Sequence, residues 1–176
     1  TIPFPRRASE PFPAFRGKPE YDEKGCVGCG ACSEVCPAHA IELVDDPRAG
    51  TRTLTLHLDS CIFCGQCELS CITEEGIALT RTYDLATVNR GELRETVRKT
   101  LLLCELCGAV IGAEDHVRWL ARRLGPAGYT NPTIMLVGQR DLGLVDSAPP
   151  SPQSPLRADR IRVLCPRCRR ATTLDL

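Results

Sequence analysis

The sequence predicts an α+β protein in three parts, and three observations lead to this prediction. Residues 1–20 hold five prolines, which block helix interiors and sheet ladders, so this part should be an extended N-terminal arm. Residues 21–83 carry two cysteine runs, and residues 52–58 between them alternate apolar and polar side chains as a half-buried strand does. Residues 84–176 carry two more cysteine pairs together with apolar residues at helical spacing, which predicts a C-terminal extension.

Eight cysteines repeat the spacing C-x2-C-x2-C-x3-C, as Cys26, Cys29, Cys32 and Cys36, then Cys61, Cys64, Cys67 and Cys71. This spacing is typical of two-cluster bacterial ferredoxins, where three thiolates bind one [4Fe–4S] cluster and the fourth binds the other. The expected ligands are therefore crossed. They are Cys26, Cys29, Cys32 and Cys71 for a first cluster, and Cys61, Cys64, Cys67 and Cys36 for a second. The sequence thus predicts a ferredoxin-like two-[4Fe–4S] domain over residues 21–83, which should unfold when the clusters are removed.

A disulfide framework and a pair of zinc sites are the alternative uses of these eight cysteines. Disulfides need an oxidising compartment and usually an export signal, and no apolar export segment is visible. Zinc would need neither the third cysteine of each run nor the duplicated spacing. Twelve cysteines in such a chain therefore indicate metal binding in a reducing cytosol.

Two later C-x2-C knuckles, each after a short apolar stretch, form the second constellation: Cys104, Cys107, Cys165 and Cys168. Two knuckles on two strands can close a tetrahedral four-cysteine zinc site, so the extension is expected to be zinc-ribbon-like. Rubredoxin-like iron at the same ligands, a pair of local disulfides and a redox-active C-x-x-C stay open as alternatives.

Short elements are expected around these cysteines. Residues 40–44 and 76–79 should be strands that pair in small sheets over the clusters, with a hairpin turn at 45–50. Asn89 is expected to cap a helix through Leu93 and Val97, while the leucines at 101–103 also fit a buried strand. Beyond them the sequence predicts a helix over 117–124, a buried strand or hydrophobic contact at 133–137, and a proline- and serine-rich linker at 147–155.

Aromatic residues and charge are unevenly distributed along the chain. Phe4, Phe12 and Phe15 lie in the arm. Aromatic residues at this density usually mark a contact surface, so the arm is expected to bind a neighbouring subunit; a free tail is the alternative. Residues 21–79 hold three basic and ten acidic residues, whereas residues 80–176 hold fifteen basic and ten acidic ones. This asymmetry fits either ordinary solvated surface or two faces for two partners. No run of about 20 apolar residues occurs, so no transmembrane span is expected.

The order of these features resembles a known family. Phe15-Arg-Gly-Lys-Pro-Glu20, the run from Cys26 to Cys36, Cys61-Ile-Phe-Cys-Gly-Gln-Cys-Glu68 and the two late knuckles follow one another. In this order they resemble the dicluster subunit of formate hydrogenlyase and related membrane-bound group 4 [NiFe]-hydrogenases. That subunit is the counterpart of the dicluster subunit I of respiratory complex I. The chain departs from the family at Ile72, where a proline usually follows the fourth cysteine, as Pro37 does here.

The resemblance implies an electron-transfer subunit that relays single electrons through two [4Fe–4S] clusters. Its partners would be an electron-input subunit (a formate dehydrogenase or a ferredoxin-like protein), the hydrogenase small and large subunits, and membrane-arm subunits. The implied location is peripheral, on the cytoplasmic side of the cell membrane. The sequence shows no nucleophile–base pair and no phosphate loop, so no catalytic residue is expected.

Three other functions are weighed against this one. A complex I-type subunit shares the dicluster motif, and a stand-alone ferredoxin carrier would need neither the aromatic arm nor the late knuckles. A nucleic-acid-binding zinc ribbon would use Arg167, Arg169 and Arg170, but basic residues near a knuckle are weak evidence, so no nucleic-acid partner is expected.

Overall fold

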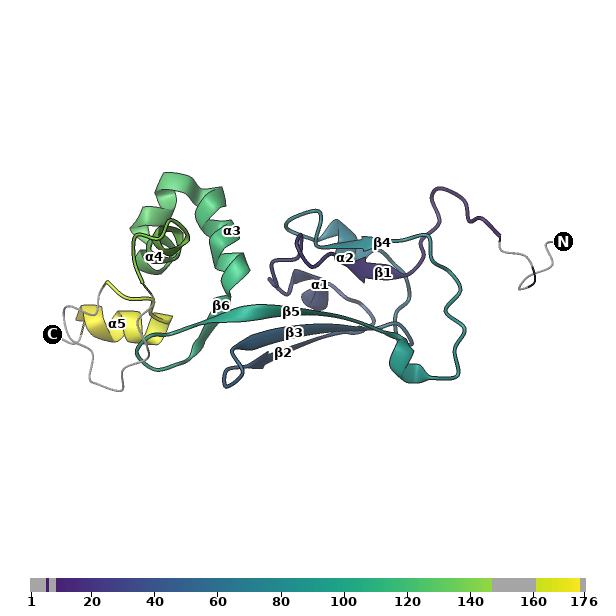
Figure 1. Ribbon diagram of the computed structural model, residues 1–176, viewed down its shortest axis with the longest axis horizontal. Coiled ribbons are helices and arrows are strands. Elements are labelled where there is room, and N and C mark those ends of the chain that lie inside the picture. Colours follow the sequence, from purple (N-terminus) through teal and green to yellow (C-terminus); the bar gives the residue numbers. More distant parts are fainter. Residues whose placement is uncertain (1–5, 7–8, 147–160, 175–176) are drawn as a thin grey trace. The chain divides into compact units, whose positions relative to one another are not determined.

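The computed structural model describes residues 6, 9–146 and 161–174 (Figure 1). The chain forms two compact units. Unit 1 comprises Thr1–Cys26, Gly30–Glu42 and Thr55–Val97, and unit 2 comprises Val27–Cys29, Leu43–Leu54 and Arg98–Leu176. The linker expected at 147–155 and Phe4 of the arm lie outside the described residues. Among the described residues, no helix combines the length and apolar character that crossing a bilayer requires.

The strands form two sheets. In the smaller sheet, β1 (Pro19–Tyr21) pairs antiparallel with β4 (Ile77–Leu79), so that Glu20 lies opposite Ala78. The larger sheet has the order β2-β3-β5-β6, with bounds Ile41–Asp46, Thr51–His57, Arg94–Leu103 and Val110–Ala113. The strand predicted at 52–58 and its hairpin with 40–44 are therefore present, and alternation buries Leu54 and Leu56.

The strands that follow the two cysteine runs lie in different sheets. The sequence predicts that 40–44 and 76–79 form small sheets over the clusters, and both are strands, β2 and β4. However, β4 pairs with β1, which comes from the end of the predicted arm and the residue after it. Ile77 is buried there, and the backbone N–H of Thr80 donates to Lys18 O at 2.9 Å, which extends the pairing.

The helix predicted after Asn89 is wrong. Asn89 does act as a cap, because its side chain accepts a hydrogen bond from the Gly91 N–H, but only the 3-10 helix η1 (Arg90–Glu92) follows. Residues 94–103 instead form β5, in which Val97 and Leu101 are buried. Residues four apart share one face in a strand as well as in a helix, so this pair cannot separate the two periods. The strand alternative for 101–103 is confirmed.

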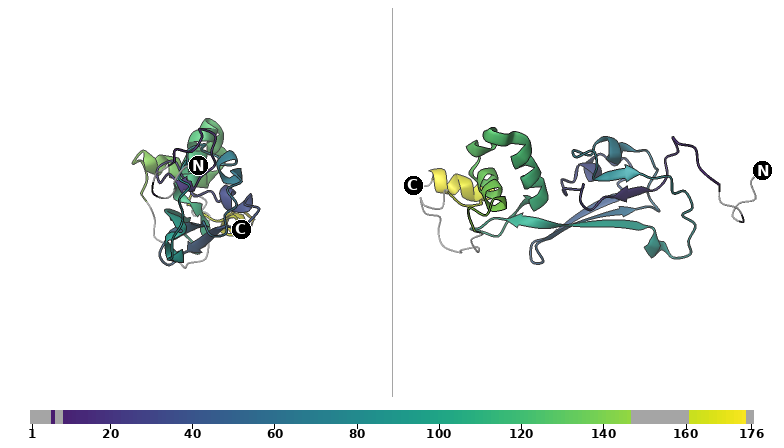
Figure 2. Two further views of the ribbon diagram at one scale, coloured as in Figure 1. Left: turned by 90° about the vertical axis from the view of Figure 1, so that its right-hand side faces the viewer. Right: turned by 45° about the horizontal axis from the view of Figure 1, so that its top comes forward.

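Helices pack together in unit 2. The predicted helix is present as α3 (Glu114–Leu124), and it lies beside α4 (Pro132–Asp141) in Figures 1 and 2. The 3-10 helix η2 (Gly125–Thr130) joins them. Of the two alternatives predicted for 133–137, the strand is wrong, because Asn131 caps α4 by accepting from the N–H groups of Thr133 and Ile134. The hydrophobic contact is confirmed, because Leu136 and Val137 are buried. The buried core of this part consists of Leu102, Val117, Leu136, Val137 and Val163.

Part of the arm lies along its own chain in unit 1. Gly17 N–H donates to Thr80 O at 2.9 Å, and Lys18 N–H donates to Thr82 O at 2.8 Å. The ring of Phe15 meets Tyr83 edge-on at 6.2 Å between centroids, whereas Phe12 is 84% exposed. Contacts within the chain therefore hold residues 15–18, and of the arm's described phenylalanines both Phe12 and Phe15 stay exposed, Phe12 far more than Phe15.

Candidate metal centres

Four cysteines from both runs line one cavity in unit 1. They are Cys36 from the first run and Cys61, Cys64 and Cys67 from the second, and Pro19, Ile41 and Leu56 close the apolar side. Cys67 lies in the short helix α2 (Gln66–Leu69), which begins after Gly65 with a left-handed φ of 82°. The structure therefore brings together the four cysteines that the spacing assigns to the second cluster.

The surroundings of these sulfurs favour metal-bound cysteines over free, charged thiolates. Burial raises the pKa of Cys67 to about 11, and burial likewise raises the pKa of Cys61. Backbone N–H groups of Ala40 and Phe63 donate to Cys36 Sγ and Cys61 Sγ at 3.3 and 3.4 Å. A buried thiolate needs a positive partner, and iron bound to the sulfur supplies it, so this donor set fits an iron–sulfur cluster.

Three of the four cysteines expected to bind the first cluster, Cys26, Cys32 and Cys71, belong to unit 1. Cys32 lies in α1 (Ala31–Glu34), which begins after Gly30 with a φ of 85°, as α2 begins after Gly65. The repeated spacing therefore gives the same local turn in both runs.

Gly76 places Cys26 next to Cys71. A Cβ on Gly76 would lie 3.0 Å from Cys26 Cα and 3.1 Å from Cys71 Sγ, so a larger residue there would push on the backbone of Cys26. The Tyr21 hydroxyl is 4.0 Å from Cys32 Sγ. Burial is the main cause that raises the pKa of Tyr21, and the charges of Cys32, Cys26 and Cys67 raise it further. Tyr21 and Gly76 are site residues that the sequence analysis does not identify, because neither belongs to the cysteine pattern.

In unit 2, Arg52 holds the loop of the first run. Its Nη1 donates to Gly28 O at 2.8 Å, and its other nitrogens form a two-point contact with Asp45 at 2.7 and 2.8 Å. The hydrogen bond with Arg52 is the main reason why the pKa of Asp45 lies below its usual range. The hydrogen bond with Asp45 is likewise the main reason why the pKa of Arg52 is raised, and the charge of Cys29 adds to it.

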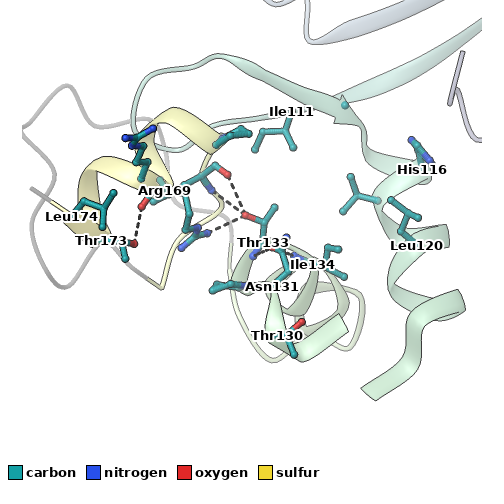
Figure 3. A pocket seen from close by; sticks show the side chains of 16 residues that line it. Ile111, His116, Leu120, Thr130, Asn131, Thr133, Ile134, Arg169, Thr173 and Leu174 are labelled. Atoms are coloured by element: carbon teal, nitrogen blue, oxygen red, sulfur yellow. Dashed lines mark hydrogen bonds between the residues drawn. The ribbon is translucent and has the colours of Figure 1, made fainter. Parts of the chain in front are cut away.

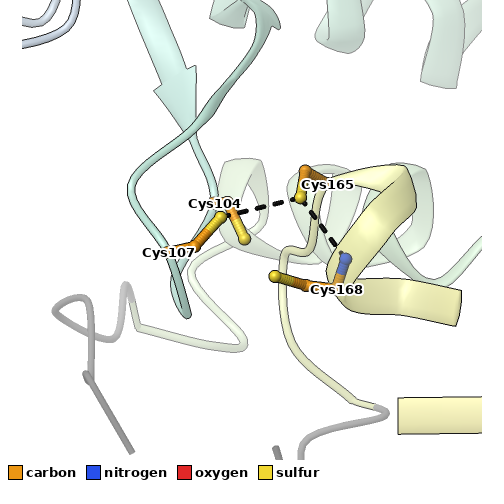
Figure 4. Close-up of side chains that lie close together, drawn as sticks. All are labelled: Cys104, Cys107, Cys165 and Cys168. Atoms are coloured by element: carbon orange, nitrogen blue, oxygen red, sulfur yellow. Dashed lines mark hydrogen bonds between the residues drawn. The ribbon is translucent and has the colours of Figure 1, made fainter. Parts of the chain in front are cut away.

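The four late cysteines converge on one point in unit 2 (Figure 4). The sulfurs of Cys104, Cys107, Cys165 and Cys168 all lie within 4.8 Å of one another, and three of these residues are buried. The Sγ atoms of Cys107 and Cys165 are 3.7 Å apart. A disulfide bond is about 2.05 Å long, whereas a tetrahedral Zn–S site with bonds of about 2.3 Å has S···S edges of about 3.8 Å. The geometry therefore fits a four-thiolate metal ion.

The two knuckles have different backbones. The first follows β5, but the second opens helix α5 (Pro166–Leu174), with Cys165 just before it and Cys168 in its first turn. The expectation of two knuckles on two strands is therefore wrong for the second. A helix start directs N–H groups toward the metal site, as Cys168 N–H does toward Cys165 Sγ at 3.5 Å.

Backbone donors prepare one of these sulfurs for a metal. Burial opposes ionisation of Cys104, but N–H groups of Cys165, Cys107 and Leu106 lower its pKa to about 7. Burial and the neighbouring thiols raise the pKa of Cys168. A cation at the centre would bind the sulfurs in place of the protons that these crowded thiols carry without it.

Glu105, which lies in the first knuckle, connects it to the segment before the second knuckle through buried polar contacts. Glu105, only 5% exposed, forms an ion pair with Arg140, and its Oε2 accepts from Val163 N–H at 2.9 Å. The Glu105 N–H also donates to Val163 O at 2.9 Å. This pairing brings the segment before Cys165 against the first knuckle, and thus positions all four sulfurs.

A cavity of about 870 Å³ lies beside the second knuckle, between α3, α4 and α5 (Figure 3). Arg169 lies at its edge and donates to Thr133 Oγ1 at 3.0 Å and to Arg162 O at 2.6 Å. Arg169, one of three arginines considered above for nucleic-acid binding, is therefore used to join α5 to α4.

The two cysteine runs together match a known protein family. Residues 25–74 match the family model "4Fe-4S dicluster domain", so these cysteines hold two [4Fe–4S] clusters. The chain is 34% identical over 103 residues to formate hydrogenlyase subunit 6 of Escherichia coli, covering 58% of this chain and 57% of that protein. It is 32% identical over 100 residues to NADH-quinone oxidoreductase subunit I 2 of Geobacter metallireducens, covering 52% of this chain and 76% of that protein.

Solved structures with a similar chain include the membrane-bound sulfane sulfur reductase, an archaeal respiratory membrane complex. The identity is 33%, the match covers 53% of this chain and 49% of that chain, and the TM-score is 0.42. The present chain thus spans about half the length of this protein and of the hydrogenlyase subunit.

Proposed function

We propose that this chain, which belongs to the NADH-quinone oxidoreductase subunit I family of dicluster iron–sulfur proteins, is the electron-relay subunit of a membrane-bound [NiFe]-hydrogenase complex of the formate hydrogenlyase kind. It would stand between an electron-input subunit and the hydrogenase small subunit, peripheral on the cytoplasmic side of the membrane. When bound, the two clusters supply one-electron reduction and oxidation.

The observation that carries this proposal is the cavity in which Cys36 meets the second run. Because Cys36 belongs to the first run, its place beside Cys61, Cys64 and Cys67 supports crossed ligation. By the same pattern, the first cluster takes Cys26, Cys29, Cys32 and Cys71. Crossing holds two clusters close together, which is what a relay between partners requires.

The residues around the cysteines would hold the clusters and exclude water from them, and would take no chemical part in electron transfer. Pro19, Ile41 and Leu56 exclude water from the second set, and Gly76 lets the backbone approach Cys71 closely. We also propose that Cys104, Cys107, Cys165 and Cys168 bind zinc, with iron as the alternative metal. This ion would fix the extension, since closed four-thiolate zinc sites are structural.

Recovery of the chain with its natural partners tests the relay. We expect an affinity tag on the full chain to recover nickel-containing hydrogenase subunits, about eight cluster irons and about one zinc per chain. EPR after reduction should show two interacting S = 1/2 centres. Recovery as a lone monomer at native expression levels would instead favour a stand-alone carrier, and partners without nickel would favour a complex I-type subunit.

A further inference from the structure

Cys36 and Cys71 occupy equivalent places at the ends of the two runs, but different side chains follow them. Two residues after each cysteine stand Ala38 and Thr73. The Thr73 hydroxyl oxygen lies 3.3 Å from Cys71 Sγ, whereas the methyl group of Ala38 offers no donor.

The other donors near the two sulfurs are matched in part. Ala40 N–H donates to Cys36 Sγ at 3.3 Å, and the backbone N–H groups of Thr73, Gly76 and Ile77 are directed to Cys71 Sγ. The Thr73 hydroxyl, 3.3 Å from Cys71 Sγ, is a side-chain donor that this half has and that Ala38 cannot supply in the other.

The hydroxyl is held against the sulfur by its surroundings. The hydroxyl donates to Gly25 O at 2.9 Å, and a Cβ on Gly76 would lie 3.2 Å from Thr73 Oγ1 and 3.1 Å from Cys71 Sγ. The single proton of Thr73 can serve either the carbonyl or the sulfur. A thiolate is charged, and hydrogen bonds to charged acceptors are about twice as strong as neutral ones, so ligand formation directs the proton toward Cys71.

Cations border both runs and do not explain a difference between them. Arg52 donates to Gly28 O in the first run, at 2.8 Å, and Arg16 donates to Cys64 O in the second, at 3.3 Å. The hydroxyl is a difference in kind, because it acts on a ligand sulfur directly.

We infer that the Thr73 hydroxyl raises the reduction potential of the cluster bound by Cys71, so that this cluster is easier to reduce than the cluster bound by Cys36. The inference rests on the crossed ligation of the proposed function. Adding one electron increases the negative charge on the cluster and its thiolates. A donor at a thiolate stabilises that charge and raises the reduction potential, since hydrogen bonds to cluster sulfurs are among the factors that set it. Electrons entering the relay would therefore rest on the first cluster.

A controlled-potential titration of the full, cluster-loaded chain, followed by EPR, tests this inference. Wild-type protein should give two reduction steps. In Thr73→Val we expect the step at higher potential to move down while the other stays, and a shift of the lower step alone would contradict the inference. In Thr73→Ser we expect the wild-type position, because serine keeps the hydroxyl. Iron content equal to that of the wild type shows that both clusters remain bound.

The reciprocal variant Ala38→Thr adds a hydroxyl at the equivalent place and should move the other step to higher potential. It decides the question if Thr73→Val loses iron. Two unchanged steps in the fully loaded variants, or an upward shift in Thr73→Val, would overturn the inference. Wild-type protein that binds iron but gives no pair of cluster signals would instead count against the proposed function.

Discussion

Gly28 and Phe63 stand at the same place in the two cysteine runs, two residues after the first cysteine of each. Both have a left-handed backbone, with φ of 69° and 53°. A Cβ on Gly28 would lie 3.0 Å from both Ala113 Cβ and Lys99 Cγ in unit 2, whereas Phe63 lines the cavity of the second set with its ring partly buried. The spacing of the cysteines therefore sets the backbone, and the neighbours of each loop decide which side chain it tolerates.

Paired cysteine removals test whether the two runs exchange ligands, and they should give the largest effect. Crossed ligation predicts that Cys36→Ala with Cys64→Ala damages one cluster and leaves about half of the cluster iron. Cys36→Ala with Cys29→Ala should damage both and leave none. Iron counting in the two double variants measures this. If the first pair loses all cluster iron and the second keeps half, each run binds its own cluster.

Gly28→Ala should be the most damaging single change in the comparison of the two loops. The left-handed backbone costs an alanine about 1 kcal/mol, and crowding against the buried Ala113 adds a similar amount. We expect the midpoint of thermal cluster loss, followed by visible absorbance, to fall by about 5 °C or more. Gly50→Ala, at a φ of 66° with open space around it, is the control for the backbone term alone.

Phe63→Gly should change little. Glycine relieves about 1 kcal/mol of left-handed strain but loses a comparable amount of conformational entropy on folding. The same midpoint should therefore stay within about 2–3 °C of the wild type. A large fall would mean that the Phe63 side chain, rather than its backbone, stabilises the loop.

Asp45→Asn should have a small effect, because it removes only a support of the first loop. The hydrogen bond to Arg52 lowers the pKa of Asp45, so the stabilisation is complete above the unfolded pKa, near 4, and is lost as pH falls through the folded pKa. We expect a midpoint lower than the wild type by about 1–3 °C at pH 7, with the difference shrinking below about pH 4. A difference that does not depend on pH would assign the effect to packing.

Part of this architecture is readable from the sequence because it is local. The eight cysteines, the hairpin at 41–57 and α3 all follow from spacing or periodicity. The helix α4 was readable too, since Asn131 followed by Pro132 is a strong helix start that the apolar run at 133–137 concealed. The pairing of β4 with β1 depends on contacts between residues about 60 apart, which no local pattern carries.

For the four late cysteines, too, the sequence shows the local features but not the contacts between distant residues. Their spacing indicates a metal, but the helix that carries Cys168 and the buried pair of Glu105 with Arg140 emerge only in three dimensions. Thr73 and Tyr21 are ordinary residues in the sequence. They matter because folding places their hydroxyl groups beside sulfurs.

The cavity shared by Cys36 and the second run also bears on ancestry. If ligation is crossed as proposed, and if the domain arose by doubling of one short gene, each cluster of the single-copy ancestor would have needed a cysteine from a second chain. Such an ancestor would have worked as a pair of identical chains. Joined in one polypeptide, the two copies could differ, as they do at Gly28 and Phe63 and at Ala38 and Thr73.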